Sequence, residues 1–417
     1  MTGQELLEIS NNKIFRPTVM NKVISELVPP ADRFRLTDNF LPFLETDTEA
    51  IIDLLNNGEY GRTNPVNLGG QHARIGVPGY SYREHEVGYW RESVVYPEDV
   101  LQKAMNPASP NQRMGNQLSV KALQFLNGRL NTLVEYVTSK ILIDGNYSEA
   151  RNGVNYTYTP KIPTAKYFLD ITASPPWTSG GTWGTAANAK PVTDVLEAIL
   201  LLSDYGILAQ SVWMNSRTGR DFMNAADTIA LIKSSPQLVQ NNANLKVIFA
   251  ALTSIQVEID DRVYNEETQL TADSPAADTT LNVVNASYFV ANDKVTLRNT
   301  LGDEEDRTIA SIASNVITLT AGVTAAFKIG DRVTVAKKFL PDHNFIVKGS
   351  NADQVAPNNW LSTPSLVKSR SWDRPLPGKY TWSKFRADEP PYTLEIGAGI
   401  NGGPKVSRCN WLRVKTR

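Results

Sequence analysis

The spacing of apolar residues predicts one long helix in the first half of the chain. Between Asn116 and Ile143, apolar side chains recur at steps of three and four, which is typical of an amphipathic helix. The positions that form this stripe are Leu123, Leu126, Leu130, Leu133, Val137 and Ile141. Asp144-Gly145-Asn146 is expected to end the helix. At about 1.5 Å per residue, the helix would be a rod of roughly 40 Å.

A mixed pattern of helices and strands follows from residue 191 onwards. Helical spacing is found at 191–204, over Arg217–Lys233 and in a segment that ends near Leu252. Strand-like runs lie at 211–215, 255–259 and 344–349. Because helices and strands interleave, this part of the chain is predicted to be an α/β or α+β module.

The segment between the last two of these strands contains an internal repeat. Matching residues recur at a constant offset of 38 positions. The matches are Thr280-Leu281 with Thr318-Leu319, Phe289 with Phe327, Asp293 with Asp331, and Val295-Thr296 with Val333-Thr334. Asn292-Asp293 and Gly330-Asp331 are predicted to be turns. Two related hairpin units of this kind should close into a small β-barrel or sandwich that is inserted into the module.

The first hundred residues contain too few aliphatic side chains for a core of their own. Residues 36–45 look extended and are expected to lie along another part of the structure. From Asn57 to Tyr96 the chain is rich in Gly, Asn, Arg and Tyr, with turn signals at Gly69-Gly70 and Pro78-Gly79. Such a region is either disordered or an arm that packs on a different molecule. The aromatic residues Tyr80, Tyr82, Tyr89 and Trp90 favour the arm.

The stretch Y-R-E-H-E-V-G-Y-W-R-E-S, from Tyr82 to Ser93, holds one of the three histidines of the chain. His85 lies between Glu84 and Glu86, so a metal or acid/base site is one interpretation. In a strand, however, successive side chains point to opposite faces, so both glutamates would point away from His85. We therefore interpret the stretch as a strand with a basic and an acidic face. Arg83, His85 and Arg91 would share the first face, and Glu84, Glu86 and Glu92 the second.

Candidate contact residues for a neighbouring molecule follow from this interpretation. They are Tyr80, Tyr82, Arg83, Glu84, His85, Glu86, Trp90, Arg91 and Glu92. No phosphate-binding glycine loop, nucleophile elbow or cysteine–histidine signature is found. The acidic run D-E-E-D at 303–306 is interpreted as a solvated turn. No catalytic residue, metal ligand or cofactor is therefore expected.

Composition and charge narrow the class of protein further. The chain has 417 residues, with 41% hydrophobic and 20% charged residues, which is ordinary for a globular protein of two or three domains. A formal net charge of −1 gives no global attraction to nucleic acid or membrane. The single cysteine, Cys409, excludes an internal disulfide framework and fits a reducing compartment. Neither a signal peptide nor a transmembrane helix is expected.

A collinear series of short motifs carries a resemblance to a known family. In chain order they are Gly76-Val77-Pro78-Gly79-Tyr80 leading into His85-Glu86-Val87, Pro97-Glu98-Asp99, Ser179-Gly180-Gly181-Thr182-Trp183, Pro191-Val192-Thr193-Asp194, Phe339-Leu340-Pro341-Asp342 with Phe345-Ile346-Val347, and the C-terminal P-Y-T-L-E-I…V-S-R-C-N-W-L-R-V. With these motifs the chain resembles the major capsid (head) proteins of tailed bacteriophages, nearest to the lambda type, which share the Hong Kong 97 capsid fold. The inserted β segment departs from the simplest family members.

The resemblance implies an α+β fold of the Hong Kong 97 type with five parts. These are an N-terminal arm at 1–50, an extended loop at 55–100, a peripheral domain with a long spine helix at 101–190 and 378–417, an axial domain at 191–267 and 338–377, and an inserted small all-β barrel at 268–337. Subunits would form hexamers and pentamers of an icosahedral shell around double-stranded DNA. The extended loop would lie across the next subunit.

The implied role is structural, without enzymatic activity. The implied partners are other copies of the chain, portal, scaffolding and decoration proteins, and packaged DNA by diffuse contact, with no membrane. The implied location is the virion, with assembly in the cytoplasm of the host bacterium. Two alternatives stay open. Eight tryptophans, among them Trp177 and Trp183 in Gly/Thr-rich settings, are compatible with a glycan-binding or carbohydrate-active protein. The β insert is compatible with a tail or decoration component.

Overall fold

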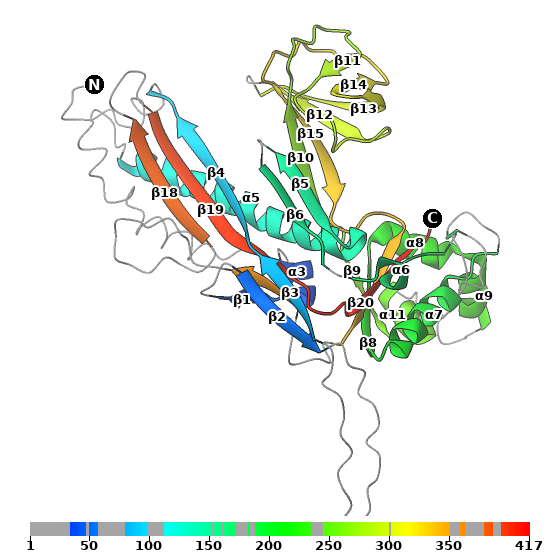
Figure 1. Cartoon of the computed structure of the whole chain (residues 1–417). Helices are drawn as coiled ribbons and strands as arrows, with labels where there is room; N and C mark the ends of the chain where they lie inside the picture. The colour runs from blue at the N-terminus through cyan, green and yellow to red at the C-terminus, as the bar shows by residue number, and fades with distance from the viewer. Residues whose placement is uncertain are drawn as a thin grey trace, which may run out of the picture. The chain divides into compact units, whose positions relative to one another are not determined.

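The chain folds into a mixed arrangement of helices and strands (Figure 1). The computed structural model describes residues 34–46, 50–56, 80–98, 112–151, 154–160, 162–171, 182–183, 188–234, 245–299, 302–350, 358–362, 379–386 and 393–417. Two compact units can be distinguished. Unit 1 comprises Met1–Leu169, Leu196–Ser211 and Ile346–Val414, and unit 2 comprises Asp170–Val195, Val212–Phe345 and Lys415–Arg417. Each unit is built from segments that are far apart in the sequence.

A single long helix, α5 (Gln112–Asp144), runs through unit 1 and confirms the predicted rod. It begins four residues earlier than expected and ends at the predicted Asp144-Gly145-Asn146 stop, where Gly145 has a φ of +75°. Leu123, Leu126 and Leu130 lie on its buried face, as the apolar spacing predicted. The helix is therefore an amphipathic element whose apolar stripe is covered by other parts of unit 1.

The main sheet of unit 1 is formed by strands from both ends of the chain. Its order is β1 (Phe43–Glu45), β17 (Asn359–Ser362), β19 (Thr393–Lys405) and β18 (Lys379–Arg386), and β4 (Gly88–Tyr96) pairs with the other edge of β19. Only the β1–β17 pair is parallel among the pairs of this sheet. The long strands β4, β19 and β18 lie beside one another and beside α5 (Figure 1).

Glycines in β19 let aromatic rings lie directly on the sheet. A Cβ atom on Gly397 would meet the ring of Trp382 at 2.1 Å, and one on Gly399 would meet the ring of Tyr380 at 2.5 Å. Both aromatic residues are on the neighbouring strand β18, paired with these glycines. Glycine is required here for close approach, because no other residue leaves room for the rings.

Unit 1 also contains two small ribbons and two short helices. The strands β2 (Ala50–Asn56) and β3 (Tyr80–Glu86) form a two-stranded antiparallel ribbon. The strands β5 (Tyr147–Arg151) and β6 (Val154–Tyr158) form another, directly after α5. The short helices are α3 (Arg35–Phe40) and α6 (Thr164–Tyr167). The expectation that residues 36–45 are extended is therefore wrong for α3 and holds for β1.

A second five-stranded sheet has the order β7 (Phe168–Asp170), β20 (Trp411–Lys415), β16 (Asn344–Gly349), β8 (Ala209–Met214) and β9 (Gln256–Ile259). The helices that alternate with these strands are α7 (Pro191–Asp204), α8 (Ser216–Asn224), α9 (Ala226–Ser234) and α11 (Leu245–Thr253). The predicted helices at 191–204 and near 252 and the three predicted strands are confirmed. The predicted single helix over Arg217–Lys233 is wrong. Ala225 has extended backbone and separates α8 from α9, although no Gly or Pro marks the break.

Residues 263–338, called the β module below, form a six-stranded sheet in unit 2. Its order is β10 (Val263–Gln269), β15 (Arg332–Lys338), β12 (Lys294–Arg298), β13 (Glu304–Ala313), β14 (Val316–Leu319) and β11 (Thr280–Asn282). The two edge strands meet beyond β10, where Leu270 bridges to Val283 and Val284 N donates to Gln269 O at 2.9 Å. The sheet therefore curls round on itself (Figure 1), and fourteen buried apolar residues fill its interior.

The repeat in the β module is visible in its hydrogen bonds. Val290 N donates to Oδ2 of Asp293 at 2.7 Å, and Lys328 N donates to Oδ2 of Asp331 at the same distance. Across the sheet, Thr296 pairs with Thr334 and Thr280 with Thr318, so each threonine faces its own repeat equivalent. The two halves are thus related by an approximate two-fold axis and are interleaved. The sequence predicted two related hairpin units, and in the structure the strands of these units interleave within one sheet.

Candidate functional site

The stretch from Tyr82 to Ser93 belongs to two strands with different partners. Up to Glu86 it is part of β3 and pairs with β2, with His85 opposite Ile51. From Gly88 it is part of β4 and pairs with β19. Val87 lies between them and is itself buried. The interpretation of the stretch as one continuous strand is therefore wrong, because the chain changes partner at Val87.

Four of the nine candidate side chains lie within the described residues. These are His85, Trp90, Arg91 and Glu92. The backbone of the other five forms part of β3, but their side chains lie outside the described residues; they are Tyr80, Tyr82, Arg83, Glu84 and Glu86. Their proposed pairing with a neighbouring molecule stays a prediction.

His85 is buried in unit 1, with 2% of its surface exposed. Its Nδ1 lies 3.1 Å from the hydroxyl of Tyr158 at the end of β6. The same hydroxyl accepts a hydrogen bond of 2.9 Å from the backbone N–H of Val406, the residue after β19. Because the hydroxyl uses a lone pair for Val406, its own proton can be donated to Nδ1 of His85. Tyr158 therefore joins β3, β6 and the end of β19.

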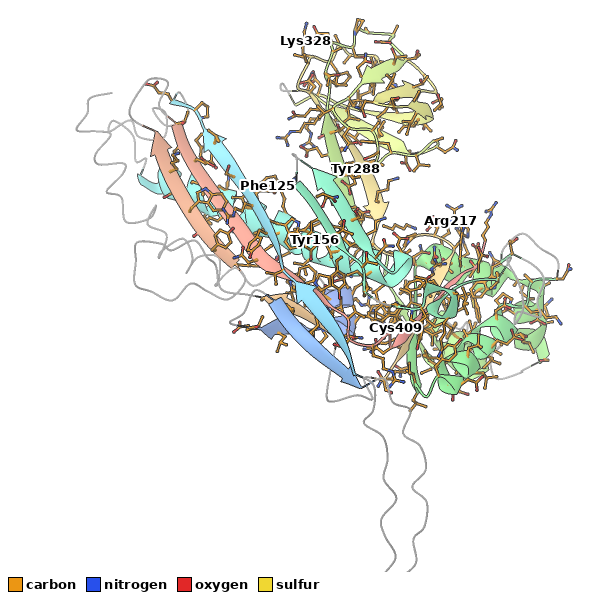
Figure 2. The ribbon with its side chains drawn as sticks, in the orientation of Figure 1. Phe125, Tyr156, Arg217, Tyr288, Lys328 and Cys409 are labelled. Carbon is orange, nitrogen blue, oxygen red and sulfur yellow. The ribbon has the colours of Figure 1, made fainter. Side chains whose placement is uncertain are left out.

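Trp90 packs against aromatic rings from two other elements of unit 1. Its ring makes an edge-to-face contact with Tyr156, labelled in Figure 2, with centroids 5.2 Å apart. Its second neighbour is Trp360 on β17, at 6.3 Å. Such aromatic pairs contribute roughly 0.5–1.5 kcal/mol beyond the burial of their area. Trp90 is thus an anchor that holds β4 to β6 and β17.

Glu92 forms a two-point ion pair with Arg129 of α5. Arg129 Nε lies 2.5 Å from Oε2 of Glu92, and Nη2 lies 2.9 Å from Oε1. Both side chains keep 40% of their surface exposed, so solvent screens the pair. We therefore expect it to contribute about 1 kcal/mol at most. Its geometric role is to fix β4 against α5.

Arg91 lies on the opposite face of β4 and is exposed. Its guanidinium carbon is 5.6 Å from the ring centroid of Tyr380 on β18. Burial raises the pKa of Tyr380 above its ordinary value, against the lowering effect of the Arg91 charge. The phenol is therefore neutral at physiological pH, and Arg91 is a cation stacked over a neutral ring.

Alternation holds within β4 and defines an outward row of side chains. After the buried Gly88, residues at even positions are half-buried, and those at odd positions are exposed. The outward row consists of Tyr89, Arg91, Ser93 and Val95, with Tyr89 45% and Val95 55% exposed. The expectation that His85 and Arg91 share a face is wrong, since one is buried and the other exposed. Ser93 and Val95 were missed, and Tyr89 was noted only as an aromatic residue of the arm, although the odd–even period that placed Arg91 would have identified all three.

Among the residues that the structure describes, no three His, Cys, Asp or Glu side chains are grouped so as to hold a metal ion. Burial raises the pKa of Cys409, so its thiol stays protonated, and its Sγ lies 3.2 Å from the carbonyl of Trp411. Within the described part of the chain, no helix is both long and apolar enough to cross a bilayer.

Two carboxylates of the acidic run at 303–306 serve the β module. Glu305 accepts hydrogen bonds from Thr324 N at 2.6 Å and Ala325 N at 3.0 Å. Asp306 accepts one of 2.7 Å from the hydroxyl of Thr296. Burial alone would raise the pKa of Glu305. The hydrogen bonds from the two backbone N–H groups and the charge of Arg307 outweigh this effect and hold the pKa below its ordinary value. Glu304, Glu305 and Asp306 also begin strand β13, so the expectation of a solvated turn is wrong for these three residues.

No family model matches the sequence, and no curated protein matches it. Solved structures do align with the chain. A prophage protein of Escherichia coli CFT073, described as a capsid protein, is 11% identical with a TM-score of 0.49, and the alignment covers 96% of this chain and 99% of that one. A phage-related protein of Bordetella bronchiseptica RB50 is 11% identical with a TM-score of 0.44, over 96% of each chain. The capsid of Staphylococcus phage Andhra is 8% identical with a TM-score of 0.37, over 94% of this chain and 88% of that one.

Proposed function

We propose that this chain is the major capsid protein of a tailed bacteriophage and has the Hong Kong 97 fold. Subunits assemble as hexamers and pentamers into the icosahedral head shell around double-stranded DNA. The observation that carries the proposal is the construction of unit 1. There, α5 of 33 residues lies beside the long strands β4 and β19, and β4 continues into the ribbon β2–β3. In the fold implied by the resemblance, α5 is the spine helix of the peripheral domain, and β3 belongs to the extended loop at 55–100.

The ribbon β2–β3 is anchored in unit 1 at His85, near one of its ends, and the rest of it is compatible with a role that requires neighbours. A two-stranded ribbon is at best marginally stable in water unless another surface covers it. In the proposed shell, residues 55–100 are the extended loop, and it lies across the next subunit. Arg83, Glu84 and Glu86 of β3 then form ion pairs with basic and acidic groups of that subunit. Tyr80 and Tyr82 supply apolar contact area at the same interface.

The proposed division of the chain follows the resemblance. Residues 1–50 are the N-terminal arm, 101–190 and 378–417 the peripheral domain, and 191–267 and 338–377 the axial domain. The β module contains the inserted barrel at 268–337, and its two edge strands are hydrogen-bonded to each other. We place this barrel on the outer surface of the shell.

The proposed partners are other copies of the chain together with portal, scaffolding and decoration proteins. Packaged DNA is held by diffuse contact only, which agrees with a formal net charge of −1. No cofactor, membrane or catalytic step belongs to this role. The protein is assembled in the host cytoplasm and functions in the virion.

The glycan-binding alternative has little support from the tryptophans. Trp183 is fully buried, donates its Nε1–H to Asp194 at 2.8 Å and stacks on Phe345 with ring centroids 5.2 Å apart. A ring in this position cannot stack on a sugar. Trp213, Trp360 and Trp411 are also buried, and Trp177 lies outside the described residues.

Electron microscopy of the expressed full chain tests the proposal. We expect closed shells, or rings of five and six subunits that close into shells when concentrated. Tubes would favour the tail-component alternative. A particle that stays a compact monomer across salt, pH and concentration would overturn the shell proposal. A glycan array and a hydrolysis assay on the same preparation test the remaining alternative.

A further inference from the structure

The helix α3 (Arg35–Phe40) cannot be stable through its own hydrogen bonds. It has six residues, whereas isolated helices shorter than about 12–15 residues are marginal in water. The residue before it, Phe34, provides no side-chain cap. The N–H groups of its first turn therefore need acceptors from elsewhere in the molecule.

These acceptors come from a single carboxylate on α5. Oε1 of Glu135 accepts a hydrogen bond of 2.7 Å from Leu36 N, and Oε2 accepts one of 3.0 Å from Thr37 N. The hydroxyl of Thr37 adds a bond of 2.6 Å to Oε2 and lies 3.0 Å from the hydroxyl of Thr138. Glu135 thus caps a helix that lies about a hundred positions earlier in the sequence. Its negative charge also complements the dipole at the helix N-terminus.

The carboxylate of Glu135 is completely buried, and so are Leu36, Thr37 and Phe40 of α3. An ionised carboxylate in an apolar setting is strongly disfavoured unless hydrogen-bond donors surround it. The same contact therefore satisfies both partners, because α3 needs an acceptor and Glu135 needs donors. Docking of α3 and burial of the Glu135 charge are coupled to each other.

Further contacts fix both ends of the docked segment within unit 1. The ring of Phe34 lies edge-on to Phe43, with centroids 5.1 Å apart, and the ammonium group of Lys379 lies 5.7 Å from its centroid. At the other end, Trp360 N lies 3.2 Å from the carbonyl of Leu41, where the chain enters β1. The residues on either side of α3 are therefore held by unit 1 as well.

We propose that α3 and Glu135 form a latch that fixes where the residues preceding Phe34 join unit 1. Glu135 is a positioning residue, because it acts through α3. The latch is a property of the isolated chain. Its consequence for assembly rests on the proposed function, in which the N-terminal arm contacts neighbouring subunits.

Hydrogen–deuterium exchange of the full-length chain with the substitution Glu135→Gln tests the latch. The glutamine side chain is nearly the same size, but it places an NH₂ group against one of the two N–H donors. We expect amide protection at residues 36–41 to fall by about tenfold or more, because the first turn loses a charge-assisted bond. Protection of α5 at 122–142 should stay within about twofold of the unsubstituted chain.

Two further variants make the result decisive. Lys140→Gln changes an exposed residue on the same helix, and it should leave protection at 36–41 unchanged. Thr37→Val removes only the hydroxyl bonds, so it should produce a smaller local loss than Glu135→Gln. If Glu135→Gln does not fold, Thr37→Val decides the question by the same measurement. Unchanged protection at 36–41, or an equal loss throughout α5, would overturn the proposal.

The latch and the shell are tested separately. If the unsubstituted chain never forms shells but Glu135→Gln opens α3, the latch stands and the proposed function fails. If shells form, we expect Glu135→Gln to give fewer closed particles than Lys140→Gln at equal protein concentration. Equal yields would show that the latch has no part in assembly.

Discussion

At the scale of single residues, one hydroxyl group joins three segments of unit 1. Tyr158 accepts from Val406 N and contacts His85, and all three lie in the interior. A buried hydrogen bond of this kind contributes little net stability when it forms. Removing one partner costs more, because the other partner is left buried without a hydrogen bond. A histidine between two glutamates thus serves to hold a strand in place.

Tyr158→Phe should therefore lower the free energy of unfolding by about 1–3 kcal/mol, since the N–H of Val406 loses its acceptor. Urea unfolding followed by tryptophan fluorescence measures the change. Thr157→Ala alters an exposed residue on the same strand and should stay within about 0.5 kcal/mol. An equal effect of both variants would mean that the hydroxyl of Tyr158 has no special role.

The carboxylate of Asp342 is expected to make the stability of unit 2 depend on pH. Its carboxylate accepts hydrogen bonds from Asn215 at 2.7 Å and Lys338 at 2.8 Å and pairs with Arg217 at 3.2 Å. Burial alone would raise its pKa, but the bond and charge of Lys338 and the charge of Arg217 hold it below the ordinary value. A lowered folded-state pKa contributes stability above the unfolded pKa of about 3.9, and this is lost as pH falls through the folded value.

Asp342→Asn should therefore destabilise the chain by about 1–3 kcal/mol at pH 7 and by less at an acidic pH below the folded-state pKa, where the native carboxyl is also protonated. Equilibrium unfolding at both pH values measures the difference. A matched change, Asp261→Asn, removes a more exposed carboxylate that binds Ser216 N at 2.8 Å and should cost less. A cost for Asp342→Asn that is the same at both pH values would contradict this account.

At the scale of elements, the aromatic cover of β19 depends on residues that have no side chain. Trp382 lies over Gly397, and the ring occupies the position that a Cβ atom would need. The glycines weaken the strand by themselves, and the rings compensate by covering it. The packing of β18 on β19 therefore requires a glycine on β19 wherever an aromatic ring of β18 lies on the strand.

Gly397→Ala should cost about 1–3 kcal/mol, because the ring of Trp382 must move away from the sheet. Thermal unfolding of the single and double variants measures this. Adding Trp382→Leu should recover part of the loss, giving a coupling of about 0.5 kcal/mol or more between the two sites. Strictly additive effects would show that the ring does not restrict position 397.

The elements also show where the sequence was informative. The presence and the end of α5, the helix at 191–204 and the 38-residue repeat depended on local spacing and were predicted. Non-local contacts decided the rest. Residues 36–40 are helical because Glu135 caps them, and the strand is divided into β3 and β4 because its partner strand changes at Val87. Trp90 and Glu92 were predicted to contact a neighbouring molecule, whereas the contacts seen within the chain, to Tyr156 and Arg129, were not predicted.

At the scale of the whole molecule, the side chains of β4 form two groups, one that points into unit 1 and one that points to solvent. Trp90 and Glu92 point inward and hold β4 on Tyr156 and Arg129. The outward row on β4 is exposed in the single chain and includes Val95 at 55%. An interface built on this row would be repeated at every equivalent position of a shell, so a small cost per contact is multiplied by symmetry.

Val95→Asp tests this division in one step. The residue is exposed, so the free energy of unfolding of the single chain should change by no more than about 0.5 kcal/mol. In the shell, burying the new carboxylate without a partner is strongly unfavourable, and we expect the yield of closed particles to fall by about tenfold or more. Val263→Asp makes the same change at an equally exposed valine, also 55%, at the start of the β module. Particle counts by electron microscopy and unfolding curves of the same variants distinguish the outcomes.

Loss of assembly in Val95→Asp, but not in Val263→Asp, would place the interface on β4. Normal shells from Val95→Asp would exclude the outward row as the interface. The ribbon β2–β3 would then be left as the contact with the next subunit.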